Sequence, residues 1–239
     1  MGEPTILATS GGYLPHPRLS YAFGPILTYA VELSGAHGHR PRVTTVGTAM
    51  GDQRHRTADS VEAAREAGFE HTDLALFPMP NLDDMEGHLL AQDVVWVHGG
   101  SVANLLAVWR VHGLDAILRR VWQSGVVLAG CSAGSICWFS GGTTDSYGPT
   151  LRPVTTGLGF LPYDNGVHYD SEAQRRPLVH ELVASGVLQE THCTDDGVGL
   201  LYHGTTLVEA VSERKGAAAF IVRRTENGVE EERVEPRLL

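Results

Sequence analysis

The segment that decides the fold is a short apolar run followed by a turn flanked by glycines, Val126-Val127-Leu128-Ala129-Gly130-Cys131-Ser132-Ala133-Gly134-Ser135-Ile136-Cys137-Trp138-Phe139. We expect residues 125–129 to form a buried strand and residues 135–139 to form a helix. Residues 130–134 match G-x-S-x-G, which sets a serine on a tight strand-to-helix turn. Helix N-termini favour a developing oxyanion. Ser132 is therefore a candidate nucleophile, the alternative being an incidental serine in a glycine-rich turn.

Outward from this turn, short apolar runs alternate with longer segments of helical periodicity. The apolar runs predict strands at residues 5–8, 42–46, 73–77, 93–98 and 125–129. The intervening patterns predict helices at residues 19–33, 57–67, 82–90, 102–111 and 114–122. Such alternation is typical of a parallel sheet covered by helices on both faces. The predicted fold class is α/β, a three-layer sandwich with a mostly parallel central sheet.

The pattern changes after Gly141. Residues 141–165 are rich in Gly, Thr and Pro and are expected to form a loop with little regular structure. A helix is expected at residues 172–184, followed by an antiparallel meander at residues 197–202, 206–212 and 217–223. Residues 225–239 are charged, and we expect them to be frayed. Because no repeat or linker is found, residues 1–239 are expected to form a single domain.

The composition excludes several classes of function. The chain has 239 residues, of which 42% are hydrophobic, so disorder is excluded as the main state. The formal charge of −10 disfavours nucleic-acid binding. No apolar run approaches the roughly 20 residues that a membrane span needs. Three cysteines without a CxxC pair and an N-terminus unlike a signal peptide predict a cytoplasmic protein without a zinc knuckle.

Two further features near Ser132 bear on its chemistry. Cys131 is a rival nucleophile, but it precedes the centre of the turn, so we interpret it as a small buried residue. The segment His98-Gly99-Gly100-Ser101 follows a predicted buried strand, and its glycines would allow a backbone N–H to approach a reacting carbonyl. Gly100 and Ala133 are thus candidate oxyanion donors, with a plain glycine turn as the alternative. We expect His98 to be structural.

A serine nucleophile needs a base, usually histidine, that a carboxylate orients. Of the 12 histidines, His168 lies in a polar loop beyond the serine and is the first candidate, with His180 and His192 as alternatives. Asp145 is the first candidate for the carboxylate. Asp195 and Asp196 form a second option, and Asp170 lies too close to His168 in the chain. Spacing alone does not decide among these acids.

At this point the chain resembles the peptidase E (aspartyl dipeptidase) family, with cyanophycinase as a more distant relative. The residues that carry the resemblance are His98-Gly99-Gly100-Ser101, Ser132-Ala133-Gly134-Ser135-Ile136-Cys137-Trp138-Phe139, Thr143-Thr144-Asp145-Ser146, His168-Tyr169-Asp170 and Thr194-Asp195-Asp196-Gly197. The resemblance implies a class I glutamine amidotransferase-like fold. It also implies Ser132 as nucleophile, His168 as base, and Gly100 and Ala133 as oxyanion donors.

The resemblance carries further expectations about the acid and the substrate. The family's acid falls between the serine and the histidine, which favours Asp145 over Asp195 and Asp196. Family substrates are peptides with an N-terminal aspartate, held by an arginine after the histidine loop, here Arg175 or Arg176. A guanidinium suits this role because it binds a carboxylate through two parallel hydrogen bonds. Neither a metal nor an organic cofactor is expected.

The leading hypothesis is a serine peptidase that cleaves short peptides, such as dipeptides with an N-terminal aspartate, through a Ser-His-Asp triad. One alternative is another acyl hydrolase, an esterase, an amidase or an isoaspartyl-type peptidase, on the same site. The other is a catalytically inactive binding protein that keeps only the fold. The exposed edge strands of a sheet would permit a homodimer, and the sequence leaves the oligomeric state open.

Overall fold

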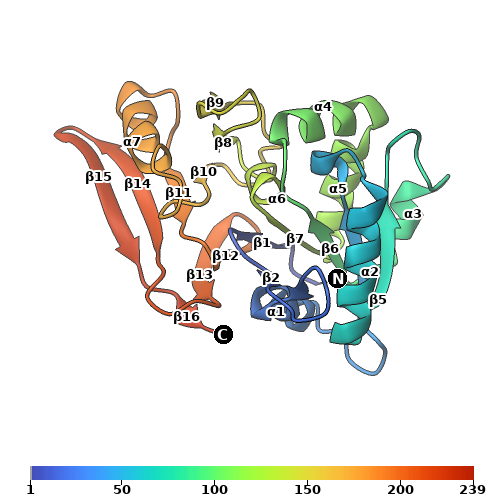
Figure 1. Ribbon diagram of the computed structural model, residues 1–239. Coiled ribbons are helices and arrows are strands. Elements are labelled where there is room, and N and C mark those ends of the chain that lie inside the picture. The colour runs from blue at the N-terminus through green and yellow to red at the C-terminus, as the bar shows by residue number, and fades with distance from the viewer. Residues whose placement is uncertain (1) are drawn as a thin grey trace.

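The computed structural model describes residues 2–239 (Figure 1). In this part of the chain a large sheet holds, in spatial order, β16 (Arg237–Leu238), β13 (Thr206–Ser212), β12 (Val198–His203), β1 (Thr5–Thr9), β7 (Val127–Cys131), β6 (Val94–Val97), β4 (Arg42–Val46) and β5 (Glu70–Leu74). The pairs from β1 to β5 are all parallel, and β12 runs antiparallel to β1. The predicted mostly parallel central sheet is confirmed.

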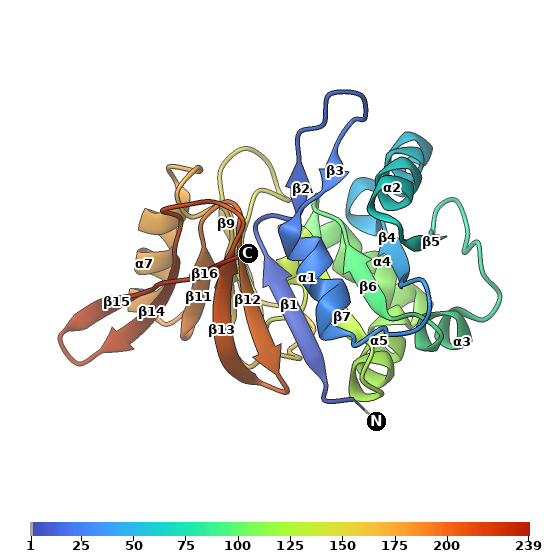
Figure 2. The same ribbon diagram turned by 90° about the horizontal axis from the view of Figure 1, so that it is seen from below.

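Successive side chains of each strand enter opposite layers. Leu7 and Trp96 pack with α1 (Pro25–Leu33) and α2 (Arg54–Ala67) on one face. Ile6 and Val95 pack on the other face, whose helices are α3 (Met85–Leu90), α4 (Val102–His112) and α5 (Leu114–Gln123). Figure 2 shows α1 over one face of the sheet and α4 and α5 on the other. The α/β sandwich is therefore present as predicted.

A second sheet follows the strand-to-helix turn at residues 130–134. Its strands, in spatial order, are β15 (Gly228–Val234), β14 (Ala219–Thr225), β11 (Thr191–Thr194), β10 (Asp164–Gly166), β8 (Gly141–Thr144) and β9 (Arg152–Val154). The helix α7 (Arg175–Ser185) packs on this sheet, and the short helix α6 (Ala133–Ile136) contacts β8 and β10. The remaining elements are β2 (Tyr13–Leu14), β3 (Ala22–Phe23) and the 3₁₀ turn η1 (Thr48–Met50).

This sheet overturns the expectation of a loop at residues 141–165, which contain β8, β9 and β10. The glycines that suggested a loop serve close packing, because a β-carbon on Gly142 would lie 2.3 Å from Asn165 O. The expected meander is also wrong in part: β12 pairs with β13, but β14 leaves for the second sheet and pairs with β11. Residues adjacent in the chain therefore end in different sheets.

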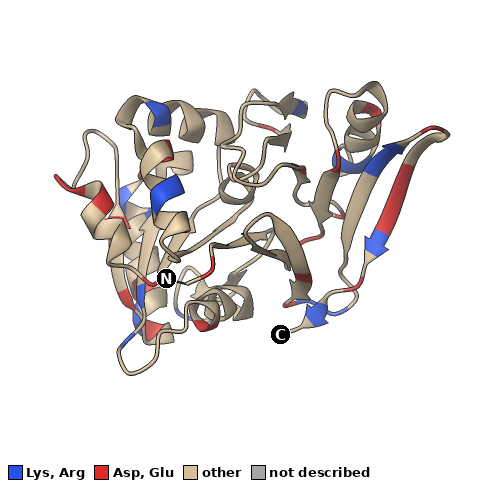
Figure 3. Ribbon diagram, turned by 180° about the vertical axis from the view of Figure 1, so that it is seen from behind, with Lys and Arg blue, Asp and Glu red and all other residues tan. Residues whose placement is uncertain are grey.

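The expectation that residues 225–239 are frayed is wrong as well. They form β15 and β16, and β15 pairs with β14 along its whole length. Figure 3 shows residues of both charge signs along this hairpin. Arg223 and Glu232 form an ion pair at 2.6 Å across the two strands. Opposite charges on facing strands stabilise a pair that its polar sequence would not suggest.

Among residues 2–239, no helix combines the length and the apolar character that crossing a membrane requires.

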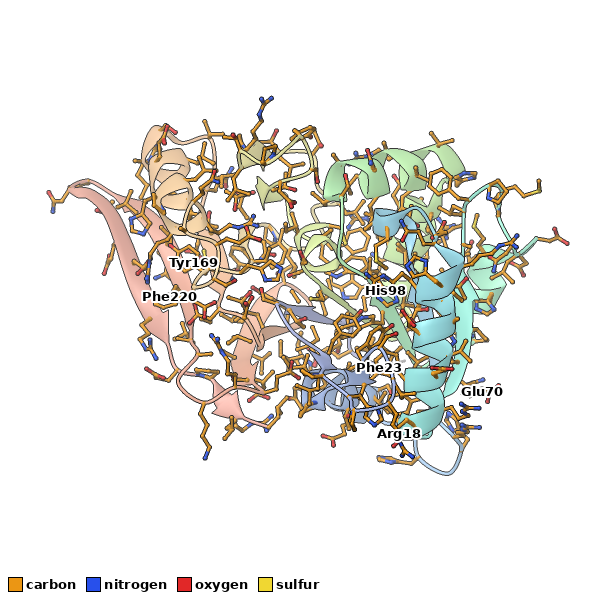
Figure 4. The ribbon with its side chains drawn as sticks, viewed as in Figure 1. Arg18, Phe23, Glu70, His98, Tyr169 and Phe220 are labelled. Carbon is orange, nitrogen blue, oxygen red and sulfur yellow. The ribbon has the colours of Figure 1, made fainter. Side chains whose placement is uncertain are left out.

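A buried chain of hydrogen bonds lies beneath the loop that follows β6. Trp96 Nε1 donates to Tyr13 Oη at 2.6 Å, and Tyr13 Oη lies 2.6 Å from His98 Nδ1. His98 Nε2 is 3.2 Å from Ser60 Oγ, which donates to Arg56 O. With each donor used once, His98 is neutral and carries its proton on Nε2. Figure 4 shows His98 beside α2. His98 is thus structural, as expected.

Protonation of His98 is expected to destabilise the fold in acid. Burial lowers its pKa from 6.5 to about 4, so the unfolded chain binds the proton more tightly than the native protein does. The contribution of the neutral His98 side chain to the free energy of unfolding is complete above pH 6.5. It is lost as the pH falls towards 4. The loss is on the order of 3 kcal/mol. Urea denaturation between pH 7.5 and 4 measures it.

The matched variant is His98→Gln, which removes the titrating group. Its free energy of unfolding should depend less steeply on pH in this window than that of the wild type. His71, whose pKa burial also lowers to about 4, adds a slope of the same sign, so both proteins are compared in a His71→Gln background. Equal slopes for the two proteins would contradict the assignment.

Candidate active site

The strand-to-helix turn at residues 130–134 has the geometry that its sequence predicts. Ser132 directly follows β7 with φ 58° and ψ −113°, and α6 begins at the next residue. A β-carbon on Gly134 would lie 2.2 Å from Val97 O, and one on Gly130 would lie 2.4 Å from Gly134 O. Both glycines are therefore required by close backbone contacts. The serine itself has a strained conformation, which costs about 1–3 kcal/mol.

The loop after β6 lies directly beside Ser132, because β6 and β7 are neighbouring parallel strands. A β-carbon on Gly99 would be 3.1 Å from Ser132 Cβ and 3.7 Å from its Oγ. Gly100 has a φ of 133°, and a β-carbon there would meet Ala49 O at 2.4 Å. Within residues 2–239, the N–H groups of Gly100 and Ala133 donate no hydrogen bond to a backbone carbonyl in a turn, loop or helix cap. They are therefore available to a ligand.

His168 follows β10 and also has a positive φ, 54°. Its Nδ1 lies 2.6 Å from Asp196 Oδ1, and its side chain is 23% exposed. Its Nε2 makes no hydrogen bond to the part of the protein that the structure describes. A carboxylate on Nδ1 leaves Nε2 as the nitrogen that can exchange a proton with a nucleophile. The carboxylate and the free Nε2 are two features of a general base, and in residues 2–239 no hydrogen bond joins this nitrogen to Ser132 Oγ.

The carboxylate at His168 is Asp196, which corrects the expectation of Asp145. Strands β8 and β11 both flank β10 in parallel, so the residues that follow them reach the same edge from opposite sides. The backbone after β10 is tied towards β11, because Tyr169 N–H donates to Thr194 O at 3.1 Å. Asp145 instead lines a separate cavity of about 280 Å³ with Glu172. The order of residues in the chain could not show this choice.

The other two carboxylates near this turn have structural contacts. Asp195 Oδ2 accepts the N–H of Ala218 at 2.9 Å, and burial raises the pKa of Asp195. Asp170 Oδ1 accepts the N–H of Asp196 at 2.9 Å, and its other oxygen pairs with Arg214. Burial alone would raise the pKa of Asp170, but these two donors lower it. Asp170 thus holds the backbone of Asp196 and does not contact His168.

The alternative bases are occupied elsewhere. His192 is 2% exposed, with Nδ1 at 2.6 Å from Tyr202 Oη and Nε2 at 2.9 Å from Glu190 Oε1. His180 Nε2 pairs with Glu231 at 2.9 Å, on the outer side of the second sheet. None of these contacts brings either ring next to the turn at residues 130–134.

The two candidate arginines have different environments. Arg175 is 2% exposed. It donates to the main-chain and side-chain oxygens of Thr143 and pairs with Glu172. Its Nε is buried without a hydrogen-bond partner in the described residues. Arg176 is bound to Glu231 at 2.6 Å, and its guanidinium stacks 4.9 Å from the Tyr169 ring centroid. Figure 4 shows Tyr169 near Phe220, which lies in β14 of the second sheet. Both arginines therefore already have carboxylate partners.

Groups that could hold a metal ion were also sought. Across residues 2–239, no three His, Cys, Asp or Glu side chains are grouped as a metal site would require.

The rival nucleophile is expected to be unreactive in the native protein. Burial raises the pKa of Cys131 to about 12, and burial also raises the pKa of Cys137 and Cys193. Because only the thiolate reacts, alkylation by iodoacetamide at pH 8 should leave all three cysteines unmodified. Mass spectrometry in the presence and absence of urea measures this. Rapid alkylation of Cys131 in the native protein would make this residue a candidate nucleophile again.

The sequence profile of peptidase family S51 matches residues 6–210. The uncharacterized peptidase YgaJ of Bacillus subtilis (strain 168) is 38% identical over 199 residues, 83% of this chain and 85% of YgaJ.

Two solved structures share the fold. A peptidase from an acI-B1 Actinobacterium has a TM-score of 0.68 at 16% identity, over 98% of this chain and 95% of that one. A protein from Listeria monocytogenes EGD-e classed as peptidase E has a TM-score of 0.62 at 15% identity, over 87% of this chain and 98% of its own. On the profile match and the identity to YgaJ, this chain belongs to peptidase family S51, the peptidase E family.

Proposed function

We propose that this protein is a serine peptidase that cleaves short peptides through an acyl-enzyme, with Ser132, His168 and Asp196 as its triad. The observation that carries the proposal is the 2.6 Å contact between His168 Nδ1 and Asp196 Oδ1, which leaves Nε2 unoccupied. The two buried histidines differ from His168, because His98 and His192 have both ring nitrogens hydrogen bonded. The carboxylate behind the ring also argues against a binding protein whose catalytic geometry has decayed.

In the proposed reaction, His168 Nε2 takes the proton of Ser132 Oγ as this oxygen attacks the peptide carbonyl. Asp196 holds the ring in the tautomer with its proton on Nδ1 and stabilises the imidazolium that forms. The carbonyl oxygen, now negative, accepts hydrogen bonds from the N–H groups of Gly100 and Ala133.

His168 then donates its proton to the leaving amine, and the acyl-enzyme forms. Water attacks the ester with His168 again acting as base, and Ser132 is regenerated. Apart from the substrate and the attacking water, every group named in this cycle belongs to the protein.

The proposed substrate class is a dipeptide or short peptide with an N-terminal aspartate. Arg175 is the better of the two candidates for its carboxylate, because its buried Nε has a free donor, whereas Arg176 stacks on Tyr169 and is bound to Glu231. A buried guanidinium is held rigidly, which favours planar recognition of a carboxylate. Binding would require the Glu172 side chain, 39% exposed, to give up its contact with Arg175.

A second candidate is an acyl hydrolase of the same site without a preference for acidic substrates. The observation that favours it is that Arg175 and Arg176 each already pair with a carboxylate, so the site has no uncommitted cation from this pair. Neutral dipeptides or simple esters would then be the substrates.

Neutralising Asp196 is expected to lower kcat on any cleaved peptide by about 10³- to 10⁴-fold in Asp196→Asn, because the histidine loses its orienting charge. Asp145→Asn should cleave at nearly the wild-type rate, since Asp145 does not contact His168. The measurement is steady-state hydrolysis of an Asp-X, Glu-X and neutral dipeptide panel together with a p-nitrophenyl ester.

Asp195→Asn is the matched control, because it makes the same change one residue away, at a carboxylate that binds a backbone N–H. A large loss in Asp145→Asn with an active Asp196→Asn would move the acid back to Asp145. If Ser132→Ala, properly folded, retained the activity of the wild type, the proposed mechanism would be wrong.

Substrate preference separates the two candidate functions. If Arg175 binds the substrate carboxylate, Arg175→Lys should lower kcat/KM for Asp-X by about 10- to 100-fold, while neutral dipeptides change little, because the two-pronged hydrogen bonding is lost. Arg176→Lys, the adjacent control, should leave both classes unchanged. Equal effects of Arg175→Lys on acidic and neutral peptides would favour the second candidate.

A further inference from the structure

The end of β1 connects two parts of the site that are far apart in the chain. Thr9 O accepts the N–H of Ser132 at 3.0 Å. The next residue, Ser10, accepts the N–H of His168 on its side-chain Oγ at 3.1 Å. Strand β1 is central in the large sheet and pairs with both β7 and β12. One strand end therefore holds the backbone of the proposed nucleophile and of the proposed base.

Both residues held in this way have backbone conformations that are unfavourable for a residue with a β-carbon. In residues 2–239, the non-glycine residues with positive φ are Asp52, Ser132 and His168. Such conformations persist only where the surrounding contacts enforce them, and they concentrate at functional sites. For His168, the enforcing contacts include the hydrogen bond from its N–H to Ser10.

The Ser10 hydroxyl is fully committed. Its Oγ lies 2.6 Å from Thr194 Oγ1 and 3.3 Å from Thr194 O, and the residue is 5% exposed. Because one acceptor position on this oxygen receives the His168 N–H, the hydroxyl proton is directed to Thr194. Thr194 O also accepts the N–H of Tyr169. The hydroxyl thus joins the base loop to the end of β11.

The main chain of Ser10 reaches the acid in the same way. Its N–H donates to Val198 O at 2.8 Å, and its carbonyl accepts the N–H of Gly197 at 2.9 Å. Gly197 directly follows Asp196 in the turn after β11. Ser10 therefore contacts the segments that carry the base and the acid, and its neighbour Thr9 contacts the nucleophile.

We propose that Ser10 is a positioning residue of this site: its hydroxyl sets the left-handed backbone of His168 and so aims the ring between Asp196 and Ser132. The inference rests on the proposed function, because it describes how that triad is assembled. Ser10 itself touches neither substrate nor reacting atoms. Its removal leaves a buried N–H without an acceptor, which allows the base loop to relax.

The test measures the reactivity of Ser132 with a fluorophosphonate probe, which needs no knowledge of the substrate. Ser10→Ala should lower the maximal rate of labelling by about 10- to 100-fold, because a base displaced by a fraction of an ångström transfers protons poorly. The probe concentration for half-maximal rate should not change. Ser10→Thr keeps the hydroxyl and should recover most of the rate.

Thr5→Val is the matched control. Thr5 lies at the opposite end of β1, is also 5% exposed, and donates one hydroxyl hydrogen bond to Glu3 O. It should label at the wild-type rate. Hydrogen exchange of the His168 amide, followed by NMR, should accelerate in Ser10→Ala and not in Thr5→Val. If Ser10→Ala does not fold, Ser10→Cys, whose sulfur accepts hydrogen bonds weakly, takes its place with the same expected results.

The inference is overturned if folded Ser10→Ala labels at the wild-type rate, or if Thr5→Val slows labelling equally. Failure of the proposed function looks different: the wild type does not label, or Ser132→Ala still does. In that case hydrogen exchange of the His168 amide alone tests whether Ser10 holds this backbone. An exchange rate in Ser10→Ala equal to that of the wild type overturns the inference.

Discussion

The backbone of Gly134 passes so close to the carbonyl oxygen of Val97 that a β-carbon between them would lie 2.2 Å from that oxygen. This contact brings the start of α6 against the end of β6, so the turn after β7 and the loop after β6 share one small volume. The unused N–H groups of Gly100 and Ala133 and the side chain of Ser132 belong to these two segments. Everything else in the site is arranged around them.

The second sheet supplies what the first lacks. Strands β10 and β11 are adjacent and parallel, so His168 and Asp196 leave the same edge of that sheet and meet at 2.6 Å. The side chain of Ser135, three residues after the proposed nucleophile Ser132, donates to Asn165 Oδ1 at 2.9 Å, and Asn165 lies in β10. This polar contact thus ties α6, which follows the proposed nucleophile, to the strand that leads to the proposed base.

Buried polar groups in this protein divide into those that are fully hydrogen bonded and those that are left with a free donor or acceptor. His98 and His192 each have two ring partners and are 6% and 2% exposed, respectively, so they contribute to structure. His168 has one ring partner and is more exposed. This difference in hydrogen bonding separates the proposed base from the two buried histidines, His98 and His192.

The sequence by itself determined the strand–turn–helix unit at Ser132 and the parallel arrangement of the first strands, because glycine spacing, apolar periodicity and turn chemistry are local properties. Only the tertiary structure decided that Asp196 rather than Asp145 contacts His168, because both follow strands that flank β10. It also decided that residues 141–165 and 225–239 form strands, since β10 pairs with β11 and β15 pairs with β14, which in turn pairs with β11, so these polar or glycine-rich segments contribute strands to one second sheet. Contacts through space depend on which neighbour a loop is tied to, and no local pattern records that choice.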